Sequence, residues 1–208
     1  MSDNYVITIA RGYGSGGRTI GKLVAGELNI PFYDREILYM ASEESGINID
    51  LFGKNDEQVK RSFFGPPTDK YTGELIPPES SDFVSNKNIF NYQAKIIEEV
   101  SAKGPCVIVG RCADYILREN PNCIDVFVWA PMVDCVKNVQ ALEPLLSDRE
   151  AEKKIKKINA HRSEYYRYYA CREWDNFKNY EICLNSSALG FQKCAKLIEE
   201  YINIRFNK

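Results

Sequence analysis

Residues 10–19 read Ala10-Arg11-Gly12-Tyr13-Gly14-Ser15-Gly16-Gly17-Arg18-Thr19 and follow a β-rich apolar run, Tyr5 to Ala10. Beyond this stretch, apolar residues recur at the three- and four-residue spacing of a helix: Ile20, Leu23, Val24 and Leu28. A strand, a glycine-rich loop and a helix in this order aim backbone N–H groups and a helix dipole at one point. The sequence therefore predicts an anion-binding loop here.

The loop fits two nucleotide-binding patterns. Gly12, Gly14 and Gly17 match G-x-G-x-x-G, the dinucleotide fingerprint. Gly12 and Gly17, followed by Arg18 and Thr19, match G-x-x-x-x-G-K-[ST], the P-loop, with arginine in the lysine position. A glycine-rich turn without a ligand is a third interpretation.

The surroundings of the loop favour the P-loop. Asp34 ends a second apolar run about 20 residues on, where a dinucleotide enzyme would hold its ribose. Against that interpretation, Gly12 lies two residues beyond the first run, and Arg18-Thr19 is suited to phosphate and magnesium. The second run also leads into a polar insertion instead of a prompt crossover to a third strand. We retain the dinucleotide enzyme as the weaker alternative.

Composition narrows the class of protein. The chain has 208 residues, a formal net charge of −2 and 44% hydrophobic residues, as in an ordinary globular protein. This charge argues against a general nucleic-acid or anionic-membrane binder, and no apolar run is long enough to span a bilayer. Seven cysteines without a C-x-x-C pair, and no secretory signal, predict reduced thiols in a cytoplasmic protein. A single histidine, His161, makes a catalytic triad or a multi-histidine metal site improbable.

Strand-like and helical patterns alternate along the chain, which predicts an α/β fold with about five strands in a mainly parallel sheet between helices. The predicted strands are Tyr5 to Ala10, Pro31 to Asp34, Cys106 to Val109, Ile124 to Trp129 and Tyr180 to Leu184. The first predicted helix begins at Arg18. Further helices are predicted for Arg35 to Ser45, Asn88 to Lys103, Asp114 to Glu119, Val133 to Leu142, Asp148 to about Tyr169, and Leu189 to Ile204. Residues near 50 to 86, with two proline pairs, read as an insertion.

The sequence resembles the cytidylate-kinase-like family, a branch of the P-loop nucleoside monophosphate kinases. The resemblance rests on the stretches Gly12 to Gly21, Ile30 to Glu36, Gly104 to Tyr115 and Arg162 to Tyr166. It implies a three-layer α/β/α core formed by a single domain, residues 1–208. It also implies a helical acceptor-binding insertion at residues 46–90 and a lid at residues 148–176.

The resemblance further implies ATP as phosphoryl donor, Mg²⁺ as its metal and a nucleoside monophosphate as acceptor, with CMP suggested by the family name. Arg18 would bridge the β- and γ-phosphates, and Thr19 would ligate magnesium. Asp34 would orient the magnesium water shell or the acceptor, although pairing with a neighbouring arginine would also explain it. The implied ATP-binding residues are Gly12, Gly14, Ser15, Gly16, Gly17, Arg18 and Thr19. Arg18, Asp34 and Arg162 are the catalytic candidates.

Gly110 and Arg111 carry the implied acceptor site. They follow an apolar run, Cys106 to Val109, at the edge where ligands collect in open α/β sheets. A guanidinium suits a terminal phosphate, although an ion pair with Asp114 or Asp34 would also explain Arg111. Arg35 is a further acceptor candidate. Val109 stands where related enzymes often have an acidic residue, so the partner of magnesium is left open.

Arg162 is the leading lid candidate. It falls within an apolar stripe at helical spacing, where a guanidinium needs an anionic partner; the stripe is formed by Ile155, Ile158, Tyr165 and Tyr169. A triphosphate in the cleft would be such a partner. Arg167 and Arg172 are the weaker lid candidates. The tyrosines predict packing rather than base stacking with nucleic acid.

Two functions from different classes follow. The first is ATP- and magnesium-dependent phosphoryl transfer to a small phosphorylated acceptor. The alternative is a non-catalytic nucleotide-binding regulator of the same fold, which Arg18 in the lysine position and Val109 support. Both predict small-molecule nucleotides as partners, with neither nucleic acid nor a membrane, and both leave a homo-oligomer open.

Overall fold

A computed structural model describes residues 4–57 and 73–206 of the chain. Its centre is a five-stranded sheet in the order β2-β3-β1-β4-β5, in which every pairing is parallel. The strands are β1 Val6–Arg11, β2 Phe32–Tyr33, β3 Cys106–Val109, β4 Cys123–Trp129 and β5 Ile182–Asn185. The predicted α/β class with a parallel sheet is confirmed.

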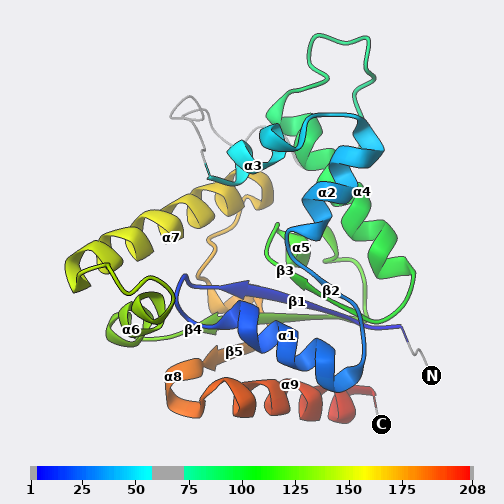
Figure 1. Cartoon of the computed structure of the whole chain (residues 1–208). Coiled ribbons are helices and arrows are strands. Elements are labelled where there is room, and N and C mark those ends of the chain that lie inside the picture. Colours follow the sequence, from blue (N-terminus) through cyan, green and yellow to red (C-terminus); the bar gives the residue numbers. More distant parts are fainter. Residues whose placement is uncertain (1–3, 58–72, 207–208) are drawn as a thin grey trace.

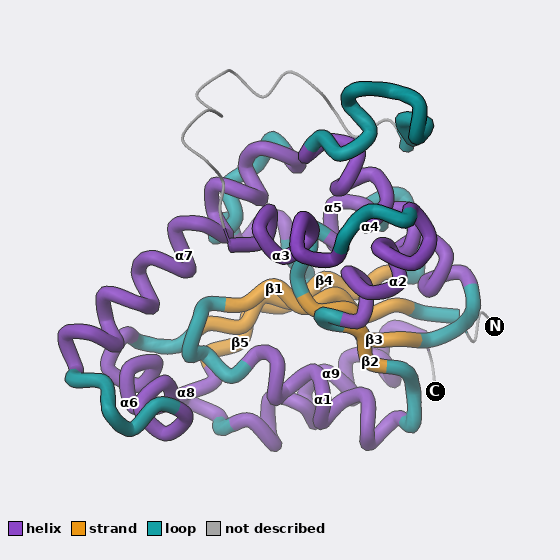
Figure 2. The backbone as a smooth tube through the Cα atoms, turned by 45° about the horizontal axis from the view of Figure 1, so that its top comes forward, coloured by secondary structure: helices purple, strands orange, loops and turns teal. Residues whose placement is uncertain are grey.

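Helices cover both faces of the sheet (Figure 1). They are α1 Gly17–Leu28, α2 Glu36–Ser45, α3 Ile49–Glu57, α4 Asn86–Ala102, α5 Ala113–Ile116, α6 Met132–Leu142, α7 Asp148–Ala170, α8 Ser186–Leu189 and α9 Phe191–Phe206. Helices α1 and α9 pack together against one face, while α2, α4 and α5 lie on the other (Figure 2). The predicted three-layer core is therefore present.

Alternation along the strands divides the core between the two faces. Ile7 and Ile9 of β1 join Val107 and the helices α1 and α9 in one buried cluster. Val6 and Ile108 face the opposite way, into a second cluster with α2 and α4. Since both faces of the central strands are covered, these strands are continuous apolar runs in the sequence.

The register of β1 and β3 places their carboxyl ends together. Ile9 pairs with Val109, and the N–H of Gly110 donates to the Ile9 carbonyl at 3.0 Å. Arg11 and Gly110 therefore leave the sheet as neighbours. Open parallel sheets collect their ligands at this edge.

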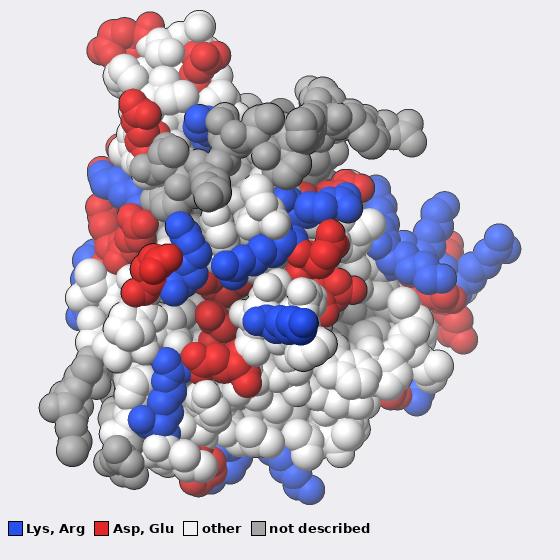
Figure 3. Space-filling model, turned by 180° about the vertical axis from the view of Figure 1, so that it is seen from behind, with Lys and Arg blue, Asp and Glu red and all other residues white. Residues whose placement is uncertain are grey.

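Helix α7 crosses above that edge (Figure 1). It begins with a capping box, in which Ser147 and Glu150 satisfy each other's backbone N–H groups. Lysine, arginine and acidic side chains intermingle where α7 begins (Figure 3), and Lys156 there pairs with Glu152. The exposed Lys and Arg side chains near the start of α7 thus form a solvated helix face.

The predicted insertion, residues 46–90, contributes α3 and the first turn of α4 to the described structure. Its central part, residues 58–72, lies outside the described residues. Among the described helices, none is long and apolar enough to cross a membrane.

Candidate active site

The loop after β1 is held by hydrogen bonds to β4, α6 and α8. The Gly12 N–H and the Ser15 hydroxyl both donate to the Val128 carbonyl, at 3.0 Å each. Asn138 donates to the Gly14 carbonyl at 2.8 Å, and Ser186 donates to the Ser15 carbonyl at 2.6 Å. Ser15 is fully buried, so its side chain builds the loop, and its hydroxyl does not face a ligand.

Gly16 requires the absence of a side chain. It caps α1 with a φ of 80°, and a Cβ there would lie 2.2 Å from the Phe191 ring. The chain can therefore turn sharply into α1, whose first-turn N–H groups at Gly17, Arg18 and Thr19 have no carbonyl four residues earlier within the helix. These groups and the helix dipole suit an anion.

Asp34 lies between two guanidinium groups. Its Oδ2 accepts from Arg18 Nε at 2.6 Å, and its Oδ1 lies 3.8 Å from Arg11 Nη2. The Asp34 side chain is 7% exposed, whereas that of Arg18 is 53% exposed. Asp34 thus holds Arg18 by a hydrogen bond and forms a longer ion pair with Arg11.

A cavity of about 770 Å³ opens beside the loop, under α7, and cationic side chains dominate its wall. Arg11 comes from β1, and Gly110 and Arg111 follow β3, so two neighbouring strands end at this cavity. The full cationic set is Arg11, Arg35, Arg111, Lys154, Lys157 and Arg162. We call this the cationic cavity. Its wall includes the predicted acceptor residues Arg35, Gly110 and Arg111, but Arg18 does not line it.

Arg111 is held in an unusual backbone conformation. Gly110, Arg111 and Cys112 have φ angles of 75°, 62° and 55°, three left-handed residues in succession. Such a conformation costs a residue with a side chain about 1–3 kcal/mol and clusters at functional sites. Arg111 is 9% exposed, so this backbone directs a nearly buried guanidinium into the cationic cavity.

Arg11 is the functional candidate that sequence analysis missed. Its guanidinium fills the space over Gly110, where a Cβ would lie 2.0 Å from Arg11 Nη1. Its carbonyl accepts a hydrogen bond from Arg162 Nη1 at 2.8 Å. The available signal was a charged residue at the end of an apolar strand, immediately before the glycine loop.

Helix α7 contacts the loop through two side chains. Asn159 Oδ1 accepts from the Tyr13 N–H at 2.8 Å. The Arg162 guanidinium, besides binding the Arg11 carbonyl, lies 5.7 Å from the centre of the Tyr13 ring. Of the three lid candidates, the structure brings Arg162 into the cavity wall, whereas Arg167 and Arg172 are exposed and do not line it.

Asp114 is the carboxyl group in the wall of the cationic cavity. Burial raises its pKa to about 7, and the nearby Asp125 charge acts in the same direction. The Tyr166 hydroxyl donates to Asp114 Oδ2 at 2.5 Å and opposes this rise. Burial therefore favours the neutral form of this carboxyl and reduces the negative charge in the wall of the cationic cavity.

The residues near the loop fit a magnesium ion that is held mainly by nucleotide. Within residues 4–57 and 73–206, no three His, Cys, Asp or Glu side chains form a metal cluster. Magnesium at such loops takes a Ser or Thr hydroxyl, phosphate oxygens and water. Thr19, exposed on the first turn of α1, is the residue that would supply such a hydroxyl. Asp34 fits less well as a direct ligand because Arg18 and Arg11 face its two oxygens.

Solved structures share this fold. An uncharacterized protein from Eubacterium ventriosum ATCC 27560 has 25% identity and a TM-score of 0.71, over 96% of this chain and 98% of that one. Shikimate kinase from Bacteroides thetaiotaomicron has 15% identity and a TM-score of 0.54, over 96% and 98% of the two chains. Shikimate kinase from Acinetobacter baumannii, in complex with shikimate, has 13% identity and a TM-score of 0.53, over 98% and 96%.

No curated protein matches the sequence. A family model does match, over residues 6–188, and it spans the glycine loop, the Gly110-Arg111 pair and α7. The chain belongs to the cytidylate kinase-like family.

Proposed function

We propose that this protein transfers the γ-phosphoryl group of ATP, with Mg²⁺, to a small phosphorylated acceptor, and that the acceptor is a nucleoside monophosphate such as CMP. The observation that carries the proposal is the cationic cavity, whose wall holds Arg11, Arg111 and Arg162. The cavity lies directly beside the loop that suits the ATP β-phosphate. Family membership supports the reaction class.

Phosphoryl transfer needs alignment of donor and acceptor and positive charge around the moving group. In this proposal, the first-turn N–H groups of α1 bind the donor phosphates, and the Thr19 hydroxyl holds magnesium. Magnesium, when bound, neutralises charge on the donor phosphates. Arg18 contacts the same phosphates from its position on Asp34, and Arg162 stabilises the charge that spreads during transfer.

The charge of the cationic cavity favours an acceptor that itself carries phosphate. In the part of the chain that the structure describes, its wall holds six Lys and Arg side chains and one carboxyl group, Asp114. A guanidinium binds phosphate oxygens in a two-pronged geometry, so Arg111 and Arg11 are suited to hold the acceptor phosphate. Shikimate, named with one of the fold neighbours, serves as the comparison acceptor.

The regulator remains the second candidate because of one contact. Arg18, in the lysine position, already donates to Asp34 at 2.6 Å. An arginine held in this way follows a moving γ-phosphate less readily than a lysine. A regulator would bind ATP and release no ADP in response to any acceptor.

A release assay separates the candidates. ADP formation is measured with ATP and Mg²⁺, alone and with CMP, UMP, AMP, GMP or shikimate. We expect release to rise most with a pyrimidine monophosphate. ATP binding without stimulation by any acceptor would favour the regulator, and stimulation by shikimate alone would exclude a phosphorylated acceptor.

Two arginines of α7 provide a matched comparison. Arg162→Met removes a cavity guanidinium, whereas Arg167→Met removes an exposed one from the same helix. We expect the first to lower stimulated ADP release by on the order of 100-fold, since residues that neutralise transition-state charge have effects of this size or larger. The second should stay within about twofold of the parent protein, because an exposed arginine contributes little.

A further inference from the structure

Four side chains on one face of α7 fasten this helix to the rest of the protein. They recur three or four residues apart, at the spacing of a helix face, and are Asn159, Arg162, Tyr166 and Tyr169. Three of them bond to backbone atoms of the glycine loop, of β1 or of α4. Tyr166 instead bonds to the side chain of Asp114. Both partners of this bond line the cationic cavity.

The Tyr166–Asp114 hydrogen bond connects the two chain segments that carry Arg111 and Arg162. Asp114 follows Arg111 by three residues, and Tyr166 follows Arg162 by four, about one turn of α7. The Tyr166 hydroxyl donates to Asp114 Oδ2 at 2.5 Å, and the two residues are 3% and 7% exposed. Water therefore competes little for this bond, and its length suits a bond to an ionised carboxylate.

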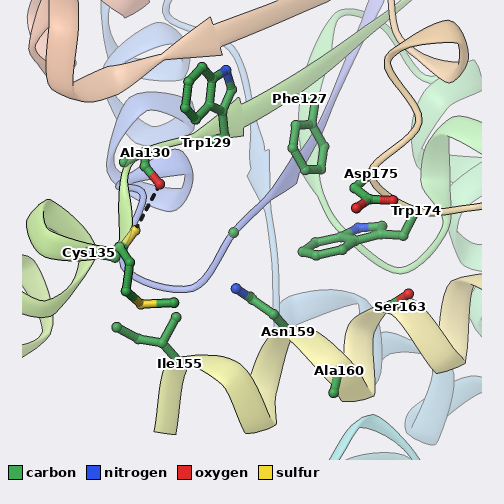
Figure 4. Close-up of a pocket in the computed structure, with 12 residues that line it drawn as sticks. Phe127, Trp129, Ala130, Cys135, Ile155, Asn159, Ala160, Ser163, Trp174 and Asp175 are labelled. Atoms are coloured by element: carbon green, nitrogen blue, oxygen red, sulfur yellow. Dashed lines mark hydrogen bonds between the residues drawn. The ribbon is translucent and has the colours of Figure 1, made fainter. Parts of the chain in front are cut away.

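Side-chain packing does not fix the middle of α7. The buried residues of this helix lie toward its two ends and are Ala151, Ile155, Tyr166, Tyr169 and Ala170. The structure describes the whole helix, and none of its residues from 156 to 165 is buried. The cationic cavity borders one face of this stretch, and a second cavity, of about 380 Å³, borders another at Asn159, Ala160 and Ser163 (Figure 4). The position of Arg162, which lies within the stretch, therefore depends on hydrogen bonds.

We propose that Asp114 and Tyr166 are positioning residues, and that their hydrogen bond sets the distance between the Arg111 and Arg162 guanidinium groups. Tyr166 is the first buried residue of α7 after Arg162, so it is the point at which the core fixes this part of the helix. The bond brings Arg162 close to an anion that Arg111 holds. This inference rests on the proposed function, because it assigns the pair a role in that same site.

Two tyrosines of α7 provide a matched pair of variants. Tyr166→Phe and Tyr169→Phe each remove one hydrogen-bonded hydroxyl from the same helix and keep the ring. Inorganic pyrophosphate is the probe, titrated by calorimetry without ATP, because its two phosphate groups can contact both arginines. We expect about tenfold weaker binding for Tyr166→Phe, and a change within about twofold for Tyr169→Phe. Equal affinities of Tyr166→Phe and the parent protein overturn the proposal.

A double-mutant cycle separates positioning from a general effect on stability. If Tyr166 acts by placing Arg162, then Tyr166→Phe should weaken pyrophosphate binding no further in an Arg162→Met background. An equal loss in both backgrounds overturns the proposal, because the hydroxyl would then act independently of Arg162.

Two neutral replacements of Asp114 test the other partner of the bond. Asp114→Asn keeps an oxygen that accepts from the Tyr166 hydroxyl, whereas Asp114→Leu has a similar size and no acceptor. Since both variants remove the same charge, we expect pyrophosphate to bind about fivefold more tightly to Asp114→Asn than to Asp114→Leu. Equal binding overturns the proposal. If Asp114→Leu does not fold, as judged by circular dichroism, the cycle with Tyr166→Phe decides.

These measurements succeed or fail independently of the proposed function. Pyrophosphate binding needs no phosphoryl transfer, so the coupling can hold in a protein that releases no ADP with any acceptor. A parent protein that releases ADP in response to an acceptor, yet binds pyrophosphate no better than Tyr166→Phe does, would keep the kinase proposal and overturn the positioning role.

Discussion

Arg18 Nε donates to Asp34 Oδ2 at 2.6 Å, so the cation in the lysine position of the loop is tied to the acid that ends β2. The same carboxylate faces Arg11 from its other oxygen. One buried acid thereby holds Arg18 by a hydrogen bond and lies within ion-pair distance of Arg11, which lines the cationic cavity.

Replacing this acid should uncouple the two arginines. Hydrogen bonds to charged groups contribute about 1.5–3 kcal/mol, so we expect Asp34→Asn to lower stimulated ADP release by on the order of 10-fold or more. Steady-state kinetics with varied ATP measures it. Asp148→Asn, an exposed aspartate on α7, is the control. Equal activity of Asp34→Asn and the parent protein would show that the ion pair does not position a functional arginine.

Gly110 should be intolerant of even a methyl group. With a φ of 75°, it leaves room for Arg11 Nη1, which would lie 2.0 Å from an added Cβ. Gly110→Ala should therefore displace Arg11 and weaken the binding of inorganic phosphate or CMP, measured by calorimetry.

Gly46 offers a control with the same backbone. Its φ is 72°, and among the described residues no atom beyond its two chain neighbours lies within 4 Å of an added Cβ. Both alanine variants should lose about 1–2 kcal/mol of unfolding free energy from the left-handed conformation. Only Gly110→Ala should lose anion affinity. If both variants lost anion affinity, that loss would be explained by backbone strain and not by displacement of Arg11.

The loop glycines should differ in their tolerance. An alanine at Gly12 meets its nearest atom at 3.8 Å, whereas at Gly16 it overlaps the Phe191 ring. We expect Gly12→Ala to keep the parent Tm and Gly16→Ala to lower it by several degrees. Identical melting of the two single variants would contradict this packing.

Asp114 should make stability depend on pH. Its pKa is raised from 3.8 to about 7, so between these values the folded protein binds more protons than the unfolded chain. The unfolding free energy should therefore fall as pH rises from about 4 to about 7, with a slope of at most about 1.4 kcal/mol per pH unit.

Urea unfolding at several pH values measures this slope, and Asp114→Asn should flatten it. Burial also raises the pKa of Asp125, which leaves a residual slope of the same sign in the variant. If the unfolding free energy rose with pH over this window in the parent protein, and did not in Asp114→Asn, the raised pKa assigned to Asp114 would be wrong.

Sequence patterns predicted most of the fold because buried parallel strands read as apolar runs. The run at Cys106 to Val109 is β3 without a shift at either end. The second strand is shorter than predicted. Only Phe32 and Tyr33 pair with β3, and the chain then turns at Asp34 into α2. The length of β2 is set by its pairing with β3, which the local sequence does not reveal.

The site was less accessible from sequence because it depends on which way each arginine points. The loop pattern predicted that Arg18 contacts the donor phosphates. Its hydrogen bond to Asp34 depends on tertiary structure, which the pattern does not reveal. Arg162 and Arg167 are five residues apart, so they point about 140° away from each other around a helix of 3.6 residues per turn. This separation accounts for one lining the cavity while the other is exposed.

The left-handed turn at Arg111 and Cys112 has a consequence for engineering the thermostability of such a protein. Glycine would relax that turn at no steric cost, so a library of variants screened for heat resistance alone would enrich glycine at position 111. The selected variants would be more thermostable and would lack the Arg111 guanidinium in the cationic cavity. Thermal robustness and anion capture thus compete for one backbone position.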